Sequence, residues 1–351
     1  MKKLILLILL LFPFKVDAIS ASAYIVMDSD NYRVLEGSNI HTPYLIASTT
    51  KIMTAMVVIN NSKLSEEIII GEEVLKSYGS GIYVEVGEKI KIQDLLYGLM
   101  LRSGNDAAMA LEHHIGGSKE GFVYLMNETA KSIGMKNTTF LNGHGLEENN
   151  KEGNKSSVYD MGLLSSYAIK NSYYKTISST KKHTVTTNYK TYIWHNKNKL
   201  LNTYDYCTGG KTGFTELAKR TLVTNASKDN INLTIITFKD GNDFEDHRML
   251  YEKYFNNYQS YKLVKKGKIK TKYKNTYIKN DINMTLNTNE YNKINTKINY
   301  YNKNVTNMIG EVEVSLNGKS YLKEKIYLDD NPRTEKISFW KKIIRKFGFN
   351  G

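Results

Sequence analysis

The stretch IASTTKIMTAMVVI, residues 46–59, decides the fold we expect, because it joins a helical pattern to a reactive pair of side chains. Its apolar residues recur at a spacing of about 3.6, which predicts an amphipathic helix over residues 49–60. Ser48 and Lys51 stand three apart at the start of that helix and therefore share one face. Burial lowers the pKa of a lysine, so the amine of Lys51 would accept the proton of Ser48. The helix N-terminus adds a positive field at the serine oxygen.

The Ser-x-x-Lys spacing is common, and it is informative only together with the other motifs that follow it in the sequence. The same spacing occurs five more times, at Ser172/Lys175, Ser178/Lys181, Ser179/Lys182, Ser320/Lys323 and Ser338/Lys341. Only the Ser48 copy opens a strongly apolar helix and is followed by both Ser103-Gly104-Asn105 and Lys211-Thr212-Gly213. Lys-Thr-Gly occurs once, and the other Ser-x-Asn triplets, 29–31 and 315–317, are out of order. The ordered set of three is the signature of penicillin-recognising serine acyl enzymes.

Longer stretches extend this likeness over most of residues 22–258. These stretches are IASTTKIMTAMVVI, LLYGLMLRSGNDAAMAL, FLNGHGL, YDMGLL and GGKTGFT. With them the chain resembles serine D-alanyl-D-alanine carboxypeptidases, the low-molecular-weight penicillin-binding proteins. It departs at Ile46 and at Gly143, where that family often has proline. The resemblance implies an α/β (α+β) fold, a β-lactamase/transpeptidase-like domain with a central antiparallel sheet flanked by helices.

The resemblance also assigns roles residue by residue. Ser48 would attack the carbonyl between two D-alanines of a peptidoglycan stem peptide, with Lys51 as base and Ser103 relaying a proton to the leaving group. Substrate-binding roles would fall to Asn105, Lys211, Thr212, Gly213 and Phe214. Among these, Gly213 would let the substrate backbone lie close to its strand, and the amides of Ser48 and Phe214 would hold the oxyanion. No cofactor and no metal are implied, and β-lactams would be inhibitors.

The pattern along the chain is consistent with such a fold. Strands are expected at 23–28 and 32–35, as a hairpin, and at 221–224 and 231–238. Helices are expected at 92–115, 119–133 and 245–258, with glycine-rich turns at 142–145 and 209–213. Strands therefore open and close the region 19–258, which predicts a sheet that joins its two chain ends.

Charge divides the chain. Of the net +14, residues 259–351 carry +12 and residues 1–18 carry +2, so residues 19–258 are neutral. Short apolar alternations at 282–286, 312–316 and 321–328 predict a small all-β domain over residues 259–330.

Both ends of the chain have sequence patterns typical of targeting or membrane-attachment segments. Residues 1–18 have two early lysines, a short apolar run and small residues near Ala18, which predicts a signal peptide. Residues 331–351 include KISFWKKIIRKFGF, with an aromatic-bearing apolar face opposite a cationic one. That segment is too short to cross a bilayer and suits the membrane interface. We therefore expect an exported protein on the outer face of the cytoplasmic membrane or in the cell wall.

Other functions stay open at this point. A class A β-lactamase would usually have Ser-Asp-Asn as its second motif and a glutamate for fast deacylation, and neither is evident here. A D,D-endopeptidase would use the same residues. A non-enzymatic, cationic wall-binding protein would explain the charge but not the ordered motifs. Nucleic-acid binding fits the charge but not export, and the oligomeric state is left open.

Overall fold

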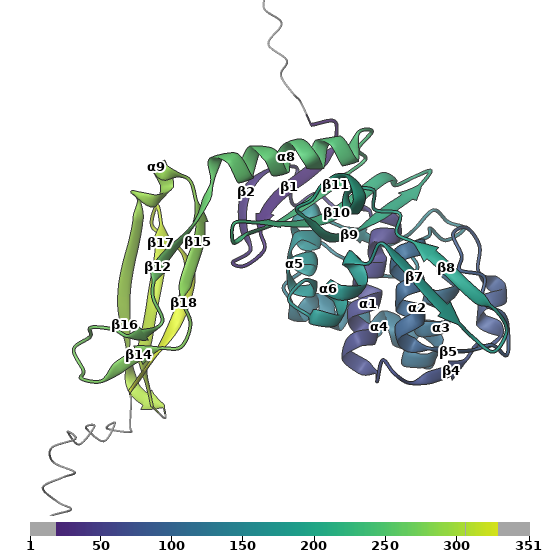
Figure 1. Cartoon of the computed structure of the whole chain (residues 1–351), viewed down its shortest axis with the longest axis horizontal. Helices are drawn as coiled ribbons and strands as arrows, with labels where there is room; N and C mark the ends of the chain where they lie inside the picture. Colours follow the sequence, from purple (N-terminus) through teal and green to yellow (C-terminus); the bar gives the residue numbers. More distant parts are fainter. Residues whose placement is uncertain (1–18, 306, 329–351) are drawn as a thin grey trace, which may run out of the picture.

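The computed structural model describes residues 19–305 and 307–328, and a five-stranded antiparallel sheet forms the centre of its larger part (Figure 1). The strand order is β2-β1-β11-β10-β9. The strands are β1 (Ala23–Asp28), β2 (Arg33–Ser38), β9 (Cys207–Thr215), β10 (Lys219–Lys228) and β11 (Ile231–Phe238). In the register, Ala23 of β1 lies opposite Phe238 of β11. The predicted antiparallel sheet that joins the two ends of this region is confirmed, as is the hairpin of β1 and β2.

Helices cover both faces of this sheet, because its inner strands are apolar on both sides. Helix α8 (Asp243–Asn257) packs on β10 and β11, and its Tyr251 joins a buried cluster with Leu233 and Ile235. Helix α5 (Val158–Ala168) packs on the other face against β1 and β11, where Met161 belongs to the larger core cluster with Met27. The predicted closing helix is therefore α8.

The helical side also holds α1 (Lys51–Asn61), α2 (Ile92–Tyr97), α3 (Asn105–Gly116) and α4 (Lys119–Ser132). The prediction of one helix over residues 92–115 is wrong. After α2 the chain makes a π-helical segment, η3 (Gly98–Arg102), and Ser103 then adopts a left-handed conformation with φ of 65°. A period-3.6 pattern does not report such a break, since the apolar residues on both sides of it still face the core.

Short elements complete this part of the molecule. They are β3 (Tyr44–Leu45), η1 (Ala47–Thr50), β4 (Glu67–Ile69), η2 (Glu72–Lys76), β5 (Lys89–Lys91), β6 (Lys155–Ser156), α6 (Ser172–Ser179), β7 (Lys182–Thr186), β8 (Thr191–His195) and α7 (Leu200–Thr203).

Residues 209–213 form part of strand β9, and the prediction of a turn there is wrong. Gly209 and Gly210 have φ of 152° and 145°, at the edge of the region that favours glycine. A Cβ on Gly210 would overlap the carbonyl oxygen of Val223, and one on Gly209 would lie 2.6 Å from Ser178 Oγ. The glycines are there because neighbouring chains pack against the strand, not because the chain turns.

Residues 259–328 form a separate all-β region, as expected. It contains β12 (Gln259–Val264), β13 (Gly267–Lys268), β14 (Thr276–Ile278), β15 (Ile282–Leu286), α9 (Thr288–Tyr291), β16 (Ile294–Val305), β17 (Met308–Leu316) and β18 (Lys319–Leu328). A sheet of order β13-β14-β18-β17-β16 accompanies the pair β12-β15, around a core of its own that includes Ile309, Val314 and Ile326. The expected strands at 282–286, 312–316 and 321–328 correspond to β15, β17 and β18.

One buried ion pair joins the two regions. Arg33 of β2 is 4% exposed and contacts both carboxylate oxygens of Glu290 in α9, at 2.8 and 2.9 Å. It also donates to the carbonyl of Thr285 at 2.9 Å. Figure 1 shows α9 at the end of the β-region nearer α8, so this contact ties the β-region to the sheet.

The predicted signal peptide, residues 1–18, and the predicted amphipathic segment, residues 331–351, lie outside the described residues. Within the described ranges, each helix is too short or too polar to cross a bilayer.

Candidate active site

Ser48 lies in η1, the tight turn that leads into α1. Ala47, just before it, has φ of 46°, a left-handed conformation that is unfavourable for a residue with a side chain. The turn is fixed at Ile46, whose carbonyl accepts from Thr49 Oγ1 at 2.6 Å and from Thr221 Oγ1 of β10 at 3.1 Å. The strained backbone is therefore held from both the helix and the sheet.

Lys51, one turn further on, is fully buried and makes three polar contacts. Its Nζ lies 3.1 Å from Ser48 Oγ, 2.7 Å from Asn105 Oδ1 and 2.6 Å from the carbonyl oxygen of His144. Burial, with the positive charge of Lys197, lowers the pKa of Lys51 to about 7, against an opposing effect of Asp106. Near neutral pH a large fraction of this amine is therefore unprotonated.

The three contacts of Lys51 Nζ determine which groups its N–H donors and its lone pair face when the amine is neutral. A neutral amine has two N–H donors and one lone pair. Asn105 Oδ1 and the His144 carbonyl can only accept, so they take the two donors. The lone pair is then left for the hydroxyl of Ser48, which becomes the donor. Loss of one proton thus turns Lys51 into a base aimed at the serine.

A second lysine–serine pair lies across the cleft. Lys211 of β9 is buried, and its Nζ donates to Ser103 Oγ at 3.1 Å and to the carbonyl of Thr212 at 2.7 Å. Burial and the charges of Lys51 and Lys197 hold the pKa of Lys211 well below its usual range. The left-handed backbone at Ser103 directs its hydroxyl toward this amine, which explains why the helix breaks here.

The first residues of α3 fix this part of the site. Asn105 donates from Nδ2 to the carbonyl of Tyr78 at 2.6 Å, so its Oδ1 faces Lys51. Asp106 accepts from the backbone N–H groups of Ile82 at 3.0 Å and Tyr83 at 2.6 Å. The carboxylate therefore holds the loop after Tyr78 against the site, a role that the motif search did not assign.

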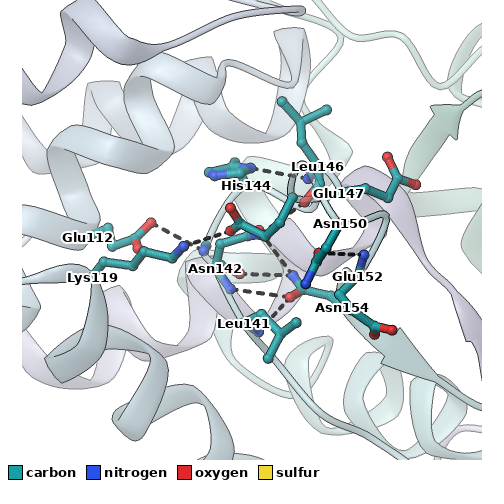
Figure 2. A network of polar contacts seen from close by, with 12 residues as sticks. Glu112, Lys119, Leu141, Asn142, His144, Leu146, Glu147, Asn150, Glu152 and Asn154 are labelled. Carbon is teal, nitrogen blue, oxygen red and sulfur yellow. Dashed lines mark hydrogen bonds and ion pairs between the residues drawn. The ribbon is translucent and has the colours of Figure 1, made fainter.

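The loop 141–146 presents the carbonyl of His144 to Lys51. Figure 2 shows the amides of Asn142 and Asn154 facing one another; Asn154 Nδ2 donates to the Asn142 carbonyl at 2.8 Å. Asn142 Oδ1 in turn accepts from the N–H of Gly145 at 2.7 Å. Gly145 has φ of 88°, and a Cβ there would overlap the carbonyl oxygen of Ala47. Side-chain amides thus give this loop one shape.

A cleft of 380 Å³ opens in front of Ser48 and Ser103. It is also lined by Ser80, Lys197, Lys199, Thr212, Gly213, Phe214, Arg220, Asp243 and Phe244. Lys197 donates to Ser80 Oγ at 3.0 Å, and Arg220 pairs with Asp243 at 2.5 Å. Sequence reasoning missed Lys197, Lys199 and Arg220, because none of them belongs to the three motifs.

Gly213 has a packing role in addition to the substrate role expected for it. A Cβ at this position would overlap Thr221 Oγ1 and lie 3.0 Å from the amide nitrogen of Ser48. The glycine therefore lets β9 approach β10 and η1 closely, rather than making room only for a substrate. Phe214 is 55% exposed beside it, on the strand at the edge of the sheet, where alternate backbone groups are unpaired.

The structure thus brings the predicted residues together. Ser48, Ser103, Thr212, Gly213 and Phe214 line one cleft, and the buried side chains of Lys51, Asn105 and Lys211 reach it through the hydrogen bonds given above. In residues 19–305 and 307–328, no three His, Cys, Asp or Glu side chains are grouped so as to hold a metal ion.

Comparisons with known proteins agree with this geometry. Residues 12–242 match the family model described as D-alanyl-D-alanine carboxypeptidase. The chain is 31% identical over 263 residues to D-alanyl-D-alanine carboxypeptidase DacF of Bacillus subtilis, covering 72% of this chain and 67% of DacF. It is 31% identical over 271 residues to D-alanyl-D-alanine carboxypeptidase DacA of Haemophilus influenzae, covering 71% of this chain and 65% of DacA. The matched stretch thus spans about two thirds of each relative.

A solved structure extends the likeness into the β-region. The crystal structure of penicillin binding protein 5 from Haemophilus influenzae superposes with a TM-score of 0.73 at 26% identity. The superposition covers 88% of this chain and 96% of that one.

Proposed function

The chain belongs to the D-alanyl-D-alanine carboxypeptidase family of serine hydrolases, and we propose that it removes the terminal D-alanine from peptidoglycan stem pentapeptides through an acyl-enzyme on Ser48. The observation that supports this most directly is the pair of buried lysines, each within 3.1 Å of a serine hydroxyl that lines the cleft.

Acylation begins with neutral Lys51. Its lone pair takes the proton of Ser48 while Ser48 Oγ forms a bond to the carbonyl carbon of the penultimate D-alanine. The oxyanion would sit between the amides of Ser48 and Phe214. The C–N bond then breaks, and Ser103, polarised by Lys211, passes a proton to the departing amine of D-alanine. The proton balance closes because Lys51 gives up to this relay the proton that it gained.

Deacylation reverses the pattern with water as the attacking group. Lys51 is again the base in reach of Ser48, and it restores the serine hydroxyl after the ester bond breaks. Of the residues that the structure places along the cleft, the one carboxylate is Asp243, and Arg220 pairs with it. A glutamate placed to speed deacylation is not among those lining residues, which favours a long-lived penicillin adduct over a β-lactamase.

The substrate's free carboxylate would bind at the positive side of the cleft. Thr212 would donate to it, and the guanidinium of Arg220 lines the same cavity. A carboxylate held there would orient the terminal D-alanine so that the preceding peptide bond faces Ser48.

We also propose where the enzyme works. Residues 1–18 would direct export, residues 19–258 would be the peptidase domain, and residues 259–330 a β-domain. Residues 331–351 would hold the protein at the outer face of the cytoplasmic membrane.

The test is incubation with a synthetic pentapeptide ending in D-Ala-D-Ala, followed by mass spectrometry. Loss of one alanine is expected, and Ser48→Ala should abolish both this loss and labelling by a fluorescent penicillin. Ser172→Ala is the matched control, because Ser172 also stands three residues before a lysine but lies in α6. Loss of two alanines, or full activity in Ser48→Ala, would overturn the proposal.

A further inference from the structure

The β-region carries a strongly basic end. Residues 263–280 contain seven lysines and no acidic residue. Five of them lie on β13, on the loop between β13 and β14, or just after β14, and all five are exposed: Lys268, Lys270, Lys272, Lys274 and Lys279. We call these five residues the basic tip.

Tyrosines order the side chains of the basic tip. The ammonium of Lys272 lies 4.1 Å from the ring centroid of Tyr300 and 5.1 Å from that of Tyr273, and these two rings contact each other edge to face. Lys279 lies 4.1 Å from the centroid of Tyr327. Tyrosine rings with cations beside them suit a boundary where an apolar medium meets charged groups.

The loop itself is held in one conformation. The backbone N–H of Lys272 donates to the hydroxyl of Tyr300 at 2.9 Å. Thr276 is 2% exposed and donates from Oγ1 to the carbonyl of Ile269 at 2.8 Å. Because the loop is ordered in advance, little conformational entropy is lost when its lysines meet a charged surface.

The carboxylates of the neighbouring strands do not neutralise the basic tip. Glu311 is paired with Lys323 at 2.6 Å, and Glu313 accepts from Asn299 at 2.6 Å. Glu324 accepts from the side chain of Asn280 at 3.1 Å. Among the described residues, none of the five tip lysines forms an ion pair within 4.0 Å with any of these glutamates, and residues 263–280 themselves hold no acidic residue, so the tip carries a local excess of positive charge.

The position of the basic tip identifies its partner. Thr276 of β14, which lies between the tip residues Lys274 and Lys279 in the sequence, pairs with Leu328, where the described part of the chain ends. The amphipathic segment follows within ten residues in the sequence. Figure 1 shows β14 at the opposite end of the β-region from α9, which contacts the peptidase sheet. The basic tip thus lies close to Leu328, the last described residue before the amphipathic segment in the sequence, and away from that contact.

We propose that the basic tip is a second membrane contact that binds an anionic lipid bilayer beside the C-terminal segment. One short amphipathic anchor binds reversibly, and stable attachment generally requires a second signal such as a basic patch. Lysines near an anionic bilayer each contribute roughly a fivefold change in affinity, so the tip adds substantially to the anchor. A two-point contact also fixes the tilt of the β-region, and with it the height of the cleft above the membrane.

Vesicle binding by the full mature chain, residues 19–351, tests the proposal. The tip variant is Lys270→Gln/Lys272→Gln/Lys274→Gln. The control variant is Lys293→Gln/Lys297→Gln/Lys319→Gln, which removes the same charge from exposed positions nearer α9. On phosphatidylglycerol-containing vesicles the tip variant should bind at least about tenfold more weakly than the control, and the difference should vanish on neutral vesicles and at high salt.

Three other outcomes refute the proposal. If vesicle binding weakened equally in both variants, the effect would come from net charge and not from the position of the tip. If vesicle binding did not weaken in the tip variant, the tip would have no role in membrane binding. Unchanged vesicle binding together with lost binding to purified anionic wall polymer would assign the tip to the wall. Fluorescent penicillin should label all variants equally; if it labelled none, including the unmodified chain, the proposed function would fail while the vesicle result would still stand.

Discussion

The protonation of Lys51 should set the acid limb of the acylation rate. With its pKa at about 7, half of Lys51 is neutral at pH 7, whereas an ordinary lysine at 10.5 would be neutral in only about 0.03% of molecules. Lowering the pH from 7 to 5 leaves about 1% neutral, so the second-order acylation rate should fall roughly fiftyfold. Stopped-flow acylation by a fluorescent penicillin between pH 5 and 9 measures this directly.

Substitution of Lys197 tests this dependence on the pKa of Lys51. Its positive charge helps to lower the pKa of Lys51, so Lys197→Gln should stabilise the protonated amine and move the acid limb to higher pH. A shift of one unit would leave about 9% of Lys51 neutral at pH 7 and slow acylation about fivefold there. Above pH 9 the variant and the unmodified enzyme should converge.

Lys199→Gln is the matched control, because Lys199 lines the same cleft with the same charge but does not contribute to the Lys51 shift. Its acid limb should stay in place. A limb that moves equally in both variants, or a rate that does not change between pH 5 and 9, would refute Lys51 as the titrating base.

Three further predictions concern backbone, interface and acid stability. Gly145→Ala should cost at least about 2 kcal/mol in urea unfolding and slow acylation, because φ is 88° and a Cβ would overlap its neighbour. Gly117→Ala, also at positive φ but with open space around it, should cost only about 1 kcal/mol and leave acylation unchanged. Arg33→Met should leave Glu290 unpaired and destabilise the contact between the regions by up to about 3 kcal/mol. Limited proteolysis should then cut between the regions while penicillin labelling persists; resistance equal to that of the unmodified chain would contradict the role of the pair. Burial lowers the pKa of His247 to about 3, so its neutral form is favoured by folding. The stability it contributes is present above pH 6.5 and is lost below that value by about 1.4 kcal/mol per pH unit. His247→Gln should reduce this acid dependence in denaturant titrations, and an unchanged slope would show that another group titrates.

Much of the catalytic site was predictable because its chemistry depends on residue types in a fixed order. Ser48 and Lys51 were found as a pair because helical spacing places them on one face, and their contact is 3.1 Å. Order along the chain then selected Ser103 among three Ser-x-Asn triplets, and Lys211 stands in the single Lys-Thr-Gly of the sequence. Strands β1 and β11 of the central sheet were found by their continuous apolar character, which is typical of strands covered on both faces.

The errors share one physical cause. Period and composition report which side of a segment is buried, but they do not report φ angles or close approaches between distant chains. The break at Ser103 and the extended glycines at 209 and 210 both depend on such approaches. Close approach also explains the packing role of Gly213, whose missing side chain accommodates Thr221 and the amide of Ser48.

By itself, the sequence determined the division into a neutral part and a basic β-region, because charge is read directly from composition. Through the resemblance that its ordered motifs carry, it also indicated the reaction class and selected eight candidate site residues, which the fold brings to one cleft. Tertiary structure alone decided that a carbonyl at His144 and an amide oxygen at Asn105 occupy both donors of a neutral Lys51. It also decided that Lys197 adds its charge to the cleft, and that the lysine-rich segment 263–280 lies at the end of the β-region away from α9. The protonation state of Lys51 and the place of a charged segment in the molecule depend on distances between residues far apart in the chain, and only folding sets those distances.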